Sequence, residues 1–220
     1  MIQSAEQFLL HQFLCAAAAK ASIRREDSDF SIQDDRVIRH MRCQDNGITF
    51  ICQAADHLDH IQDLGIDVIY MTPSFKSNSC HKYDTIDYYE IDPSFGTKEE
   101  LKELVQKAHD RGMKVVMDAV FNHTGKEFFA FKDILEKGEK SKYLDWYYID
   151  ELPLKGKWGE IPNFLCFGYY GGMPKLNLKN PEVEKYITDI ACYWIRECDI
   201  EGWRLEVGNE ISHFFWKSFR

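Results

Sequence analysis

Residues 202–210 read Gly-Trp-Arg-Leu-Glu-Val-Gly-Asn-Glu, and the fold can be worked out from this stretch. Apolar residues at 203, 205 and 207 alternate with polar residues at 204 and 206. Side chains along a strand point to opposite faces in turn, so the apolar residues share one face while Arg204 and Glu206 share the other. The pattern predicts a short buried strand that ends in a turn.

Arg204 and Glu206 also point to chemistry. A fixed cation beside a carboxylate favours the ionised form of that carboxylate. An ionised, oriented carboxylate at the end of a strand is what covalent attack on a sugar carbon requires. A structural ion pair within a strand explains the same two residues, because ion pairs perturb carboxylates in many folds. Both interpretations stand on these nine residues alone.

The composition of the 220-residue chain excludes several classes of partner. The net charge of −9 and the pI of about 5.4 argue against nucleic acid and against an anionic membrane surface. The seven cysteines are scattered without a C-x-x-C pair, which predicts reduced thiols in a cytoplasm and no zinc site. No apolar run is long enough to span a bilayer. The apolar segment 8–19 follows no Lys or Arg, so we expect no secretion leader there.

Helix and strand patterns alternate from about residue 54. This order implies a parallel sheet with right-handed crossovers. Each element is bounded by residues typical of its ends, such as Thr97 before a helix and Gly112 after it. The expected elements are a helix at 54–64, a strand at 67–72, a loop at 74–96, a helix at 98–111 and a strand at 114–121.

Residues 124–180 interrupt the alternation. They are rich in Gly, Pro and aromatic residues without a clear period, which predicts an irregular subdomain inserted over the site. A helix is expected from Pro181 to about Cys198, and another from Ile211 to Arg220.

The amino-terminal part of the chain has a different character. A helix is expected at 3–20, where an Ala-rich run favours it, and a charged, weakly periodic segment occupies 22–47. We therefore divide the chain into a helical or irregular extension of unknown role, residues 1–50, and a catalytic part, residues 51–220.

Polar residues follow the two predicted strands at the point where each ends. The second strand runs into Asp118-Ala-Val-Phe-Asn122-His123, and the first is followed by His-Lys-Tyr83-Asp84. In parallel α/β barrels the catalytic groups collect at the carboxyl ends of the strands. We therefore expect these side chains to converge with Arg204 and Glu206 on one concave face.

Together these motifs resemble the α-amylase family of glycoside hydrolases. Residues 118–123 match its Asp-x-x-x-Asn-His motif, and residues 202–210 are similar to its Gly-x-Arg-x-Asp motif on the fourth barrel strand. The segment 65–73 resembles the second-strand motif. Met-Pro-Lys-Leu-Asn at 173–177 and His-Lys-Tyr-Asp-Thr at 81–85 resemble the neopullulanase, cyclomaltodextrinase and maltogenic amylase subfamily.

This resemblance covers about residues 55–220 and implies both a fold and an activity. The implied fold is α/β: the first half of a (β/α)8 TIM barrel, with about strands two to four and an inserted subdomain. The implied activity is hydrolysis of α-glucosidic bonds in maltodextrin, cyclodextrin or pullulan by a retaining mechanism. The implied partner is an α-glucan oligosaccharide, and no cofactor is required.

The resemblance also implies roles for individual residues. Glu206 stands at the position of the catalytic nucleophile, and Arg204 would orient it and keep it ionised. The other positions would hold the reactive glucose: Tyr83 through its ring face, His123 through donated hydrogen bonds, Asp118 at the subsite wall, and Asp84 behind that wall. Asn122 occupies a position that binds calcium in some relatives. Taken singly, Asp118, Tyr83 and His123 also have ordinary structural explanations.

Two departures from the family pattern bear on activity. The family nucleophile is Asp, whereas this chain has Glu206, whose extra methylene shifts the carboxylate by more than about an ångström. Retaining glycosidases hold their two carboxyl groups about 5–5.5 Å apart. The family's general acid corresponds to a position beyond Arg220. We therefore expect the isolated chain to be inactive; a non-catalytic remnant that binds oligosaccharide is the alternative, and an α/β protein with unrelated chemistry is a third.

Overall fold

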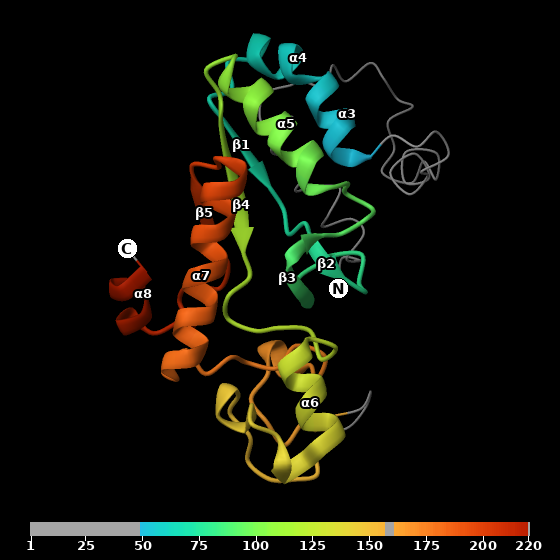
Figure 1. The fold of residues 1–220 in the computed structure, drawn as a ribbon, viewed down its shortest axis with the longest axis vertical. Helices are drawn as coiled ribbons and strands as arrows, with labels where there is room; N and C mark the ends of the chain where they lie inside the picture. Colours follow the sequence, from blue (N-terminus) through green and yellow to red (C-terminus); the bar gives the residue numbers. More distant parts are fainter. Residues whose placement is uncertain (1–48, 157–160, 220) are drawn as a thin grey trace, which may run out of the picture.

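The computed structural model describes residues 49–156 and 161–219 (Figure 1). The helix expected at 3–20 and the segment 22–47 lie outside the described residues, so the division at residue 50 stays a prediction. The helices and strands are α3 (Phe50–Asp56), α4 (Leu58–Asp63), β1 (Val68–Met71), β2 (Phe75–Ser77), β3 (Thr85–Ile91), α5 (Lys98–His109), β4 (Lys114–Ala119), α6 (Phe129–Lys137), η1 (Gly138–Lys140), η2 (Leu144–Trp146), η3 (Phe167–Tyr169), α7 (Pro181–Cys198), β5 (Gly202–Leu205) and α8 (His213–Phe219).

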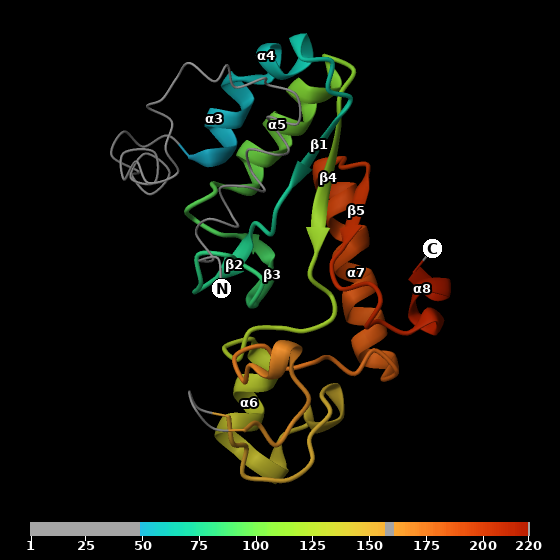
Figure 2. The same cartoon turned by 180° about the vertical axis from the view of Figure 1, so that it is seen from behind.

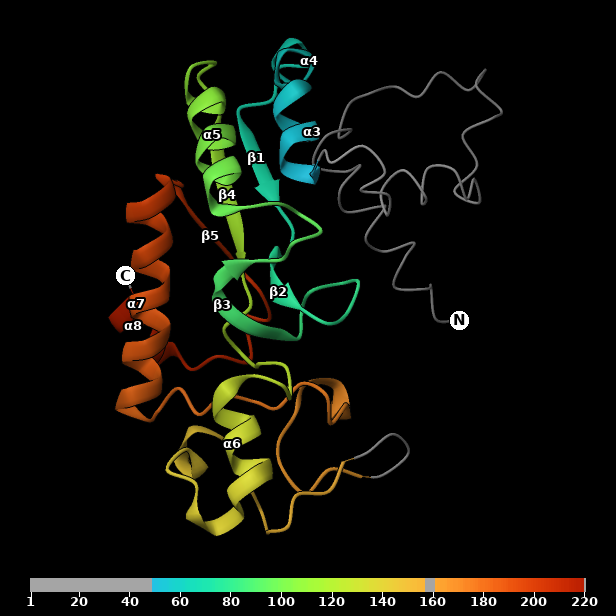
Figure 3. The same cartoon turned by 45° about the vertical axis from the view of Figure 1, so that its right-hand side comes forward.

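A parallel sheet of three strands, in the order β1-β4-β5, carries the site. In the register of the sheet, Tyr70 of β1 pairs with Val116 of β4, and Asp118 of β4 pairs with Arg204 of β5. Helices α5 and α7 lie along the sheet that they help to connect (Figures 1 and 3). Three parallel strands with helical crossovers confirm the expected partial barrel. Within the described residues, β1 and β5 each pair on one side only.

The two faces of the sheet differ as the alternation at 203–206 predicts. On the face that meets the helices, Val115 and Met117 are fully buried, and Trp203 packs against Phe121 with ring centroids 5.5 Å apart. Arg204 lies on the opposite face, beside Asp118. The expected burial of the whole stretch is wrong, because Leu205 is 42% exposed. As an outer strand, β5 is packed from fewer sides than β4.

The expected loop at 74–96 is instead a β-hairpin. Strands β2 and β3 pair antiparallel with irregular register. Tyr88 of β3 is completely buried, and its hydroxyl donates to the carbonyl oxygens of Val120 (2.7 Å) and His123 (2.9 Å). The hairpin is therefore fixed to the segment that follows β4, which positions the loop carrying Tyr83 and Asp84.

Helix boundaries follow their caps closely. A capping box joins Thr97 and Glu100 at the start of α5. Asn180 caps α7, Pro181 occupies its first turn, and the helix ends at Asp199 in a left-handed conformation. The helix expected at 54–64 is instead two short helices, because the chain breaks at His57. Among the described residues, no helix has the length and apolar character that a membrane crossing needs.

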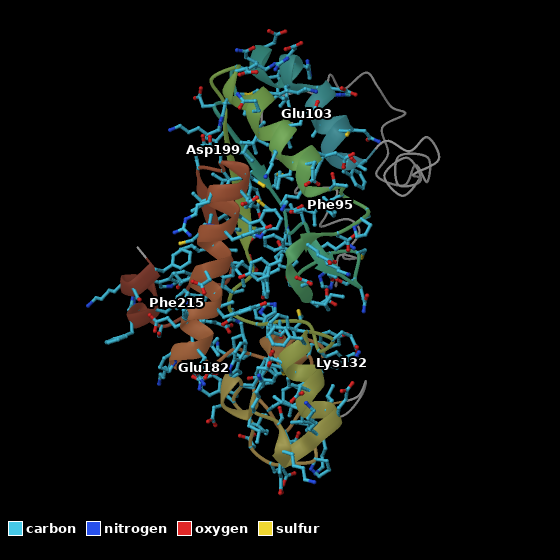
Figure 4. The ribbon with its side chains drawn as sticks, in the orientation of Figure 1. Phe95, Glu103, Lys132, Glu182, Asp199 and Phe215 are labelled. Atoms are coloured by element: carbon cyan, nitrogen blue, oxygen red, sulfur yellow. The ribbon has the colours of Figure 1, made fainter. Side chains whose placement is uncertain are left out.

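The inserted segment lies beyond the carboxyl ends of the strands (Figure 2). It contains α6 and the three 3-10 helices, and isolated bridges such as Tyr147 with Leu176 pair parts of it with one another. Its core is aromatic: the centroid of the Phe131 ring lies 5.0 Å from that of Tyr147 and 5.1 Å from that of Phe164. Trp146 donates to the carboxylate of Glu182 at 3.1 Å. Glu182 lies at the start of α7 (Figure 4), so this bond ties the segment to that helix.

The open edges of the sheet predict concentration-dependent self-association. Unpaired edge strands with apolar side chains are templates for pairing with another chain, and Val68 on β1 is 47% exposed. We expect sedimentation velocity to show oligomers that dissociate on dilution. Val68→Lys should shift the population toward monomer, because an edge lysine opposes strand pairing. A wild-type chain that stays monomeric at every concentration would contradict this prediction.

Candidate active site

Asp118, at the end of β4, is the buried centre of the site. Its side chain is fully shielded from solvent and accepts hydrogen bonds from Arg204 Nη1 at 3.3 Å to Oδ1 and 3.2 Å to Oδ2. The hydroxyl of Tyr70 donates to the same Oδ2. Burial raises the pKa of Asp118, and the bonds from Tyr70 and Arg204 oppose that rise.

Tyr70 belongs to this site although none of the motifs recognised in the sequence contains it as a site residue. It lies on β1, on the face that carries Asp118, and Arg204 lies 5.9 Å from the centre of its ring. Burial raises the pKa of its phenol, and the carboxylate of Asp118 adds to the rise. A tyrosine within an apolar strand is usually explained by core packing. Its alternation with Met71 is the pattern that could have placed it on the polar face.

Glu206 follows β5 immediately. Its backbone N–H donates to the carbonyl of Ala119 at 3.2 Å, and its carboxylate forms an ion pair with Arg204. Its side chain is 16% exposed. The next residue, Val207, has φ 47°, a left-handed conformation that is uncommon for a β-branched residue. The chain therefore turns sharply after Glu206, and the carboxylate is held by Arg204 at the strand end.

His123 is fully buried, and both of its ring nitrogens are occupied. Nε2 donates to the carbonyl of Tyr83 at 3.1 Å, so Nδ1 accepts from the amide of Asn122 at 3.3 Å. The ring stacks on Phe167 with centroids 5.0 Å apart and an interplanar angle of 13°. Burial lowers the pKa of His123 to about 4. In this arrangement Nε2–H serves the protein, whereas the resemblance implied donation to a sugar hydroxyl.

Tyr83 and Asp84 lie in the hairpin loop between β2 and β3. The carboxylate of Asp84 accepts hydrogen bonds from Ser77 Oγ (2.5 Å) and from Ser79 Oγ, so it stiffens the loop from within. Tyr83 is also hydrogen-bonded to Asp118, which links the loop to the sheet. The structure thus joins Asp118, Arg204 and Glu206 by direct contacts, and it places Tyr83 beside Asp118 and His123. The catalytic and binding roles of these residues stay predictions.

A pocket of about 380 Å³ lies between the Met-Pro-Lys-Leu-Asn segment and the turn after β5. Lys175 and Glu210 face each other in it: Lys175 Nζ lies 3.0 Å from Glu210 Oε2 and 3.3 Å from its carbonyl oxygen. The motif at 173–177 was recognisable in the sequence, but nothing there indicated that its lysine would pair with Glu210. The pair leaves the pocket with both a cationic and an anionic group.

The surroundings of Asn122 test the expected calcium position. Its Oδ1 is buried and accepts no hydrogen bond from the described residues, which is the state expected of an oxygen that binds a cation. Calcium takes six to eight oxygen ligands, however. The neighbouring carboxylate, Glu210, is already paired with Lys175, and no three His, Cys, Asp or Glu side chains gather as a metal site among the described residues. The donor set described here therefore does not fit calcium.

Removal of the Tyr70 hydroxyl should destabilise the fold. Tyr70→Phe leaves Asp118 buried with one donor fewer, and an unsatisfied buried acceptor costs about 1–3 kcal/mol. We expect urea unfolding of the monomer at pH 7 to show a loss in that range. The matched control is Tyr89→Phe, which removes the hydroxyl of a tyrosine that lies away from this site and is 38% exposed. Equal stability of Tyr70→Phe and wild type would refute the role given to this hydrogen bond.

Burial of His123 predicts a pH dependence of stability. Its pKa is about 4 in the folded state and about 6.5 when unfolded, so the unfolded chain binds more protons between these values. The stabilisation is complete above pH 6.5 and is lost as the pH falls toward 4. From pH 7 to pH 5 we expect a loss of about 2 kcal/mol from this group. Urea unfolding at both pH values should show the loss for wild type and a smaller one for His123→Gln; equal losses would exclude His123 as the cause.

Comparison with known proteins assigns a family to this arrangement. Residues 46–216 match the model described as alpha amylase, catalytic domain. A cyclomaltodextrinase of Geobacillus thermopakistaniensis is 55% identical over 165 residues, which are 75% of this chain and 28% of the relative. The intracellular maltogenic amylase of Bacillus subtilis is 50% identical over 75% of this chain and 27% of its own length.

A solved structure gives the same result. A cyclomaltodextrinase structure superposes with a TM-score of 0.73 at 52% identity, covering 76% of this chain and 28% of that one. The chain thus spans less than a third of the length of the relatives it matches. On sequence and on structure, the chain belongs to the α-amylase family and carries part of that family's catalytic domain.

Proposed function

We propose that this chain is part of a glycoside hydrolase that cleaves α-glucosidic bonds of maltodextrin, cyclodextrin or pullulan with retention of configuration. The observation that carries the proposal is the ion pair of Glu206 with Arg204, itself anchored to the buried Asp118 at the carboxyl ends of β4 and β5. This arrangement directs a carboxylate toward the side of the sheet where catalytic groups of such barrels lie. Membership of the α-amylase family supports the role of nucleophile for the Glu206 carboxylate.

In the proposed reaction Glu206 supplies the electron pair. Its carboxylate forms a bond to the anomeric carbon while the bond from that carbon to the leaving oxygen breaks. The leaving oxygen takes a proton from a general acid, and water, deprotonated by the same group, later releases the glycosyl unit. Among the described residues, Asp118 is the carboxyl group that shares Arg204 with Glu206, and its bonds to Tyr70 and Arg204 commit it to structure. The general acid is therefore expected from another part of the catalytic domain.

A second function is favoured by the identity of residue 206 itself. Glutamate is one methylene longer than the aspartate of the family motif, and a misplacement of about 1 Å can cost on the order of a hundredfold in rate. A chain with an intact sugar pocket and a misplaced nucleophile would bind oligosaccharide without cleaving it. Non-catalytic glucan binding is therefore the alternative proposal.

A cytoplasmic location accompanies the proposal. The scattered cysteines fit a reducing compartment. The Bacillus subtilis relative, named as intracellular, supports the same location. The net charge of −9 fits a neutral sugar as partner better than nucleic acid or an anionic lipid surface.

The isolated chain should not hydrolyse maltoheptaose or β-cyclodextrin. No general acid accompanies Glu206 among the described residues, and the nucleophile is too long for its position. A reducing-sugar assay of the purified chain measures this, with Glu206→Gln as control for contaminating enzymes. Turnover that Glu206→Gln abolishes would show that the chain has its own proton donor.

A chimaera separates the two proposed functions. Residues 46–216 replace the matching segment of the Geobacillus cyclomaltodextrinase, with either Glu206 or Glu206→Asp. We expect the Asp form to hydrolyse β-cyclodextrin and the Glu form to be slower by about a hundredfold or more. An inactive Asp form would count against a catalytic role for the site, whereas equal rates would exclude the non-catalytic alternative.

A further inference from the structure

The turn at residues 166–173 lies directly against the candidate site. Isolated bridges pair Cys166 with Pro174 and His123 with Lys175, so the turn is attached next to the histidine. Phe167 points inward and stacks on the ring of His123. Three backbone hydrogen bonds close the turn: Phe167 N to Met173 O, Tyr170 N to Phe167 O, and Met173 N to Tyr170 O, at 2.9–3.1 Å.

Two consecutive residues of this turn have left-handed backbone conformations. Gly168 has φ 60°, which glycine adopts without strain, but Tyr169 has φ 58°. A bulky residue with positive φ is unusual and costs on the order of 1–3 kcal/mol. Such residues cluster at active sites and ligand clamps, so the strain at Tyr169 calls for a functional explanation.

Tyr170, which is 46% exposed, packs within the turn. Its ring lies on Gly172: a Cβ there would come within 2.4 Å of the ring carbon Cε1. With Phe167 against His123 and Tyr170 over Gly172, the ring of Tyr169 is left outside and is 93% exposed. An aromatic ring in water contributes almost nothing to folding, yet the backbone is strained to hold it there.

We infer that Tyr169 is a stacking residue for an α-glucan, contacting a glucose unit beyond the one that reacts. This inference rests on the proposed function. The faces of a glucose ring carry C–H bonds, and an exposed aromatic ring with a polar hydroxyl fits such a surface. The turn connects Tyr169 rigidly to Phe167 and His123, so a glucan bound at the site would meet its ring at the rim.

Binding of maltoheptaose and of maltose to the whole chain tests the inference. Isothermal titration at a concentration where the chain is monomeric compares wild type with Tyr169→Gly and Tyr169→Phe. The matched control is Tyr89→Ala, an exposed tyrosine of β3 whose ring contacts lie on α7. We expect Tyr169→Gly to weaken maltoheptaose binding tenfold or more, Tyr169→Phe to retain it within about twofold, and Tyr89→Ala to leave it unchanged. Maltose, which is too short to reach beyond the site, should show no effect of Tyr169→Gly.

Thermal unfolding distinguishes a binding role from a structural one. Glycine relieves the positive φ, so Tyr169→Gly should raise the unfolding midpoint while it weakens binding. A lowered midpoint would indicate that Tyr169 serves folding and would overturn the inference.

Arg204→Ala separates failure of the inference from failure of the proposed function. If an Arg204→Ala chain that still unfolds cooperatively has lost maltoheptaose binding, and Tyr169→Gly leaves that binding unchanged, the inference alone falls. If the unmodified chain binds no glucan, the proposed function falls and the inference falls with it. Glucan binding that survives Arg204→Ala but is lost in Tyr169→Gly would show that Tyr169 contacts glucan at a place other than the candidate site.

Discussion

The guanidinium of Arg204 is the element on which the site depends, because it contacts two carboxylates at once. One is Asp118, which is fully buried on the central strand; the other is Glu206, at the end of the outer strand. A buried carboxylate without such a partner would be strongly destabilising. The bond to Asp118 also fixes where the guanidinium lies, and the guanidinium in turn fixes Glu206. The strand register that places Arg204 beside Asp118 therefore also compensates the buried charge and orients the candidate nucleophile.

Two residues near this arrangement have backbone conformations that are unfavourable for their residue types. Val207 directly follows Glu206, and Tyr169 stands two residues after Phe167, which stacks on His123. Both residues have positive φ. Each is a residue type for which that conformation is unfavourable. The surrounding sheet and hairpin, with Tyr88 bonded to two carbonyl groups, provide the rigidity that such strain requires. The fold thus holds unfavourable backbone conformations at positions next to the candidate site.

The sequence predicted those parts of the fold whose local patterns agree with their surroundings. Helices α5 and α7 carry their own caps, β1 is a continuous apolar run, and β4 is apolar apart from Lys114 and Asp118, so period and end residues sufficed. The hairpin at 75–91 was missed because its second strand, Thr-Ile-Asp-Tyr-Tyr-Glu-Ile, mixes polar and apolar residues and follows a loop rich in Ser. The exposure of Leu205 depends on what packs against β5, which no local pattern contains.

The site was predictable only in part for a related reason. Arg204, Glu206, Asp118 and His123 stand in recognisable motifs at strand ends. Tyr70 and the Lys175–Glu210 pair became visible only once the strands and the inserted segment were placed in space. A motif fixes which residues are present, whereas a contact between distant segments depends on register and on the path of the chain.

A double-mutant cycle between Asp118 and Arg204 tests the central claim most directly. Urea unfolding of monomeric wild type, Asp118→Asn, Arg204→Gln and the double variant gives the coupling energy of the pair. If the two residues join β4 to β5 as described, the coupling should be favourable by about 1–3 kcal/mol, as for a hydrogen bond to a buried charge. A coupling within about 0.3 kcal/mol of zero would mean that the two residues act independently and that Arg204 does not hold the site together.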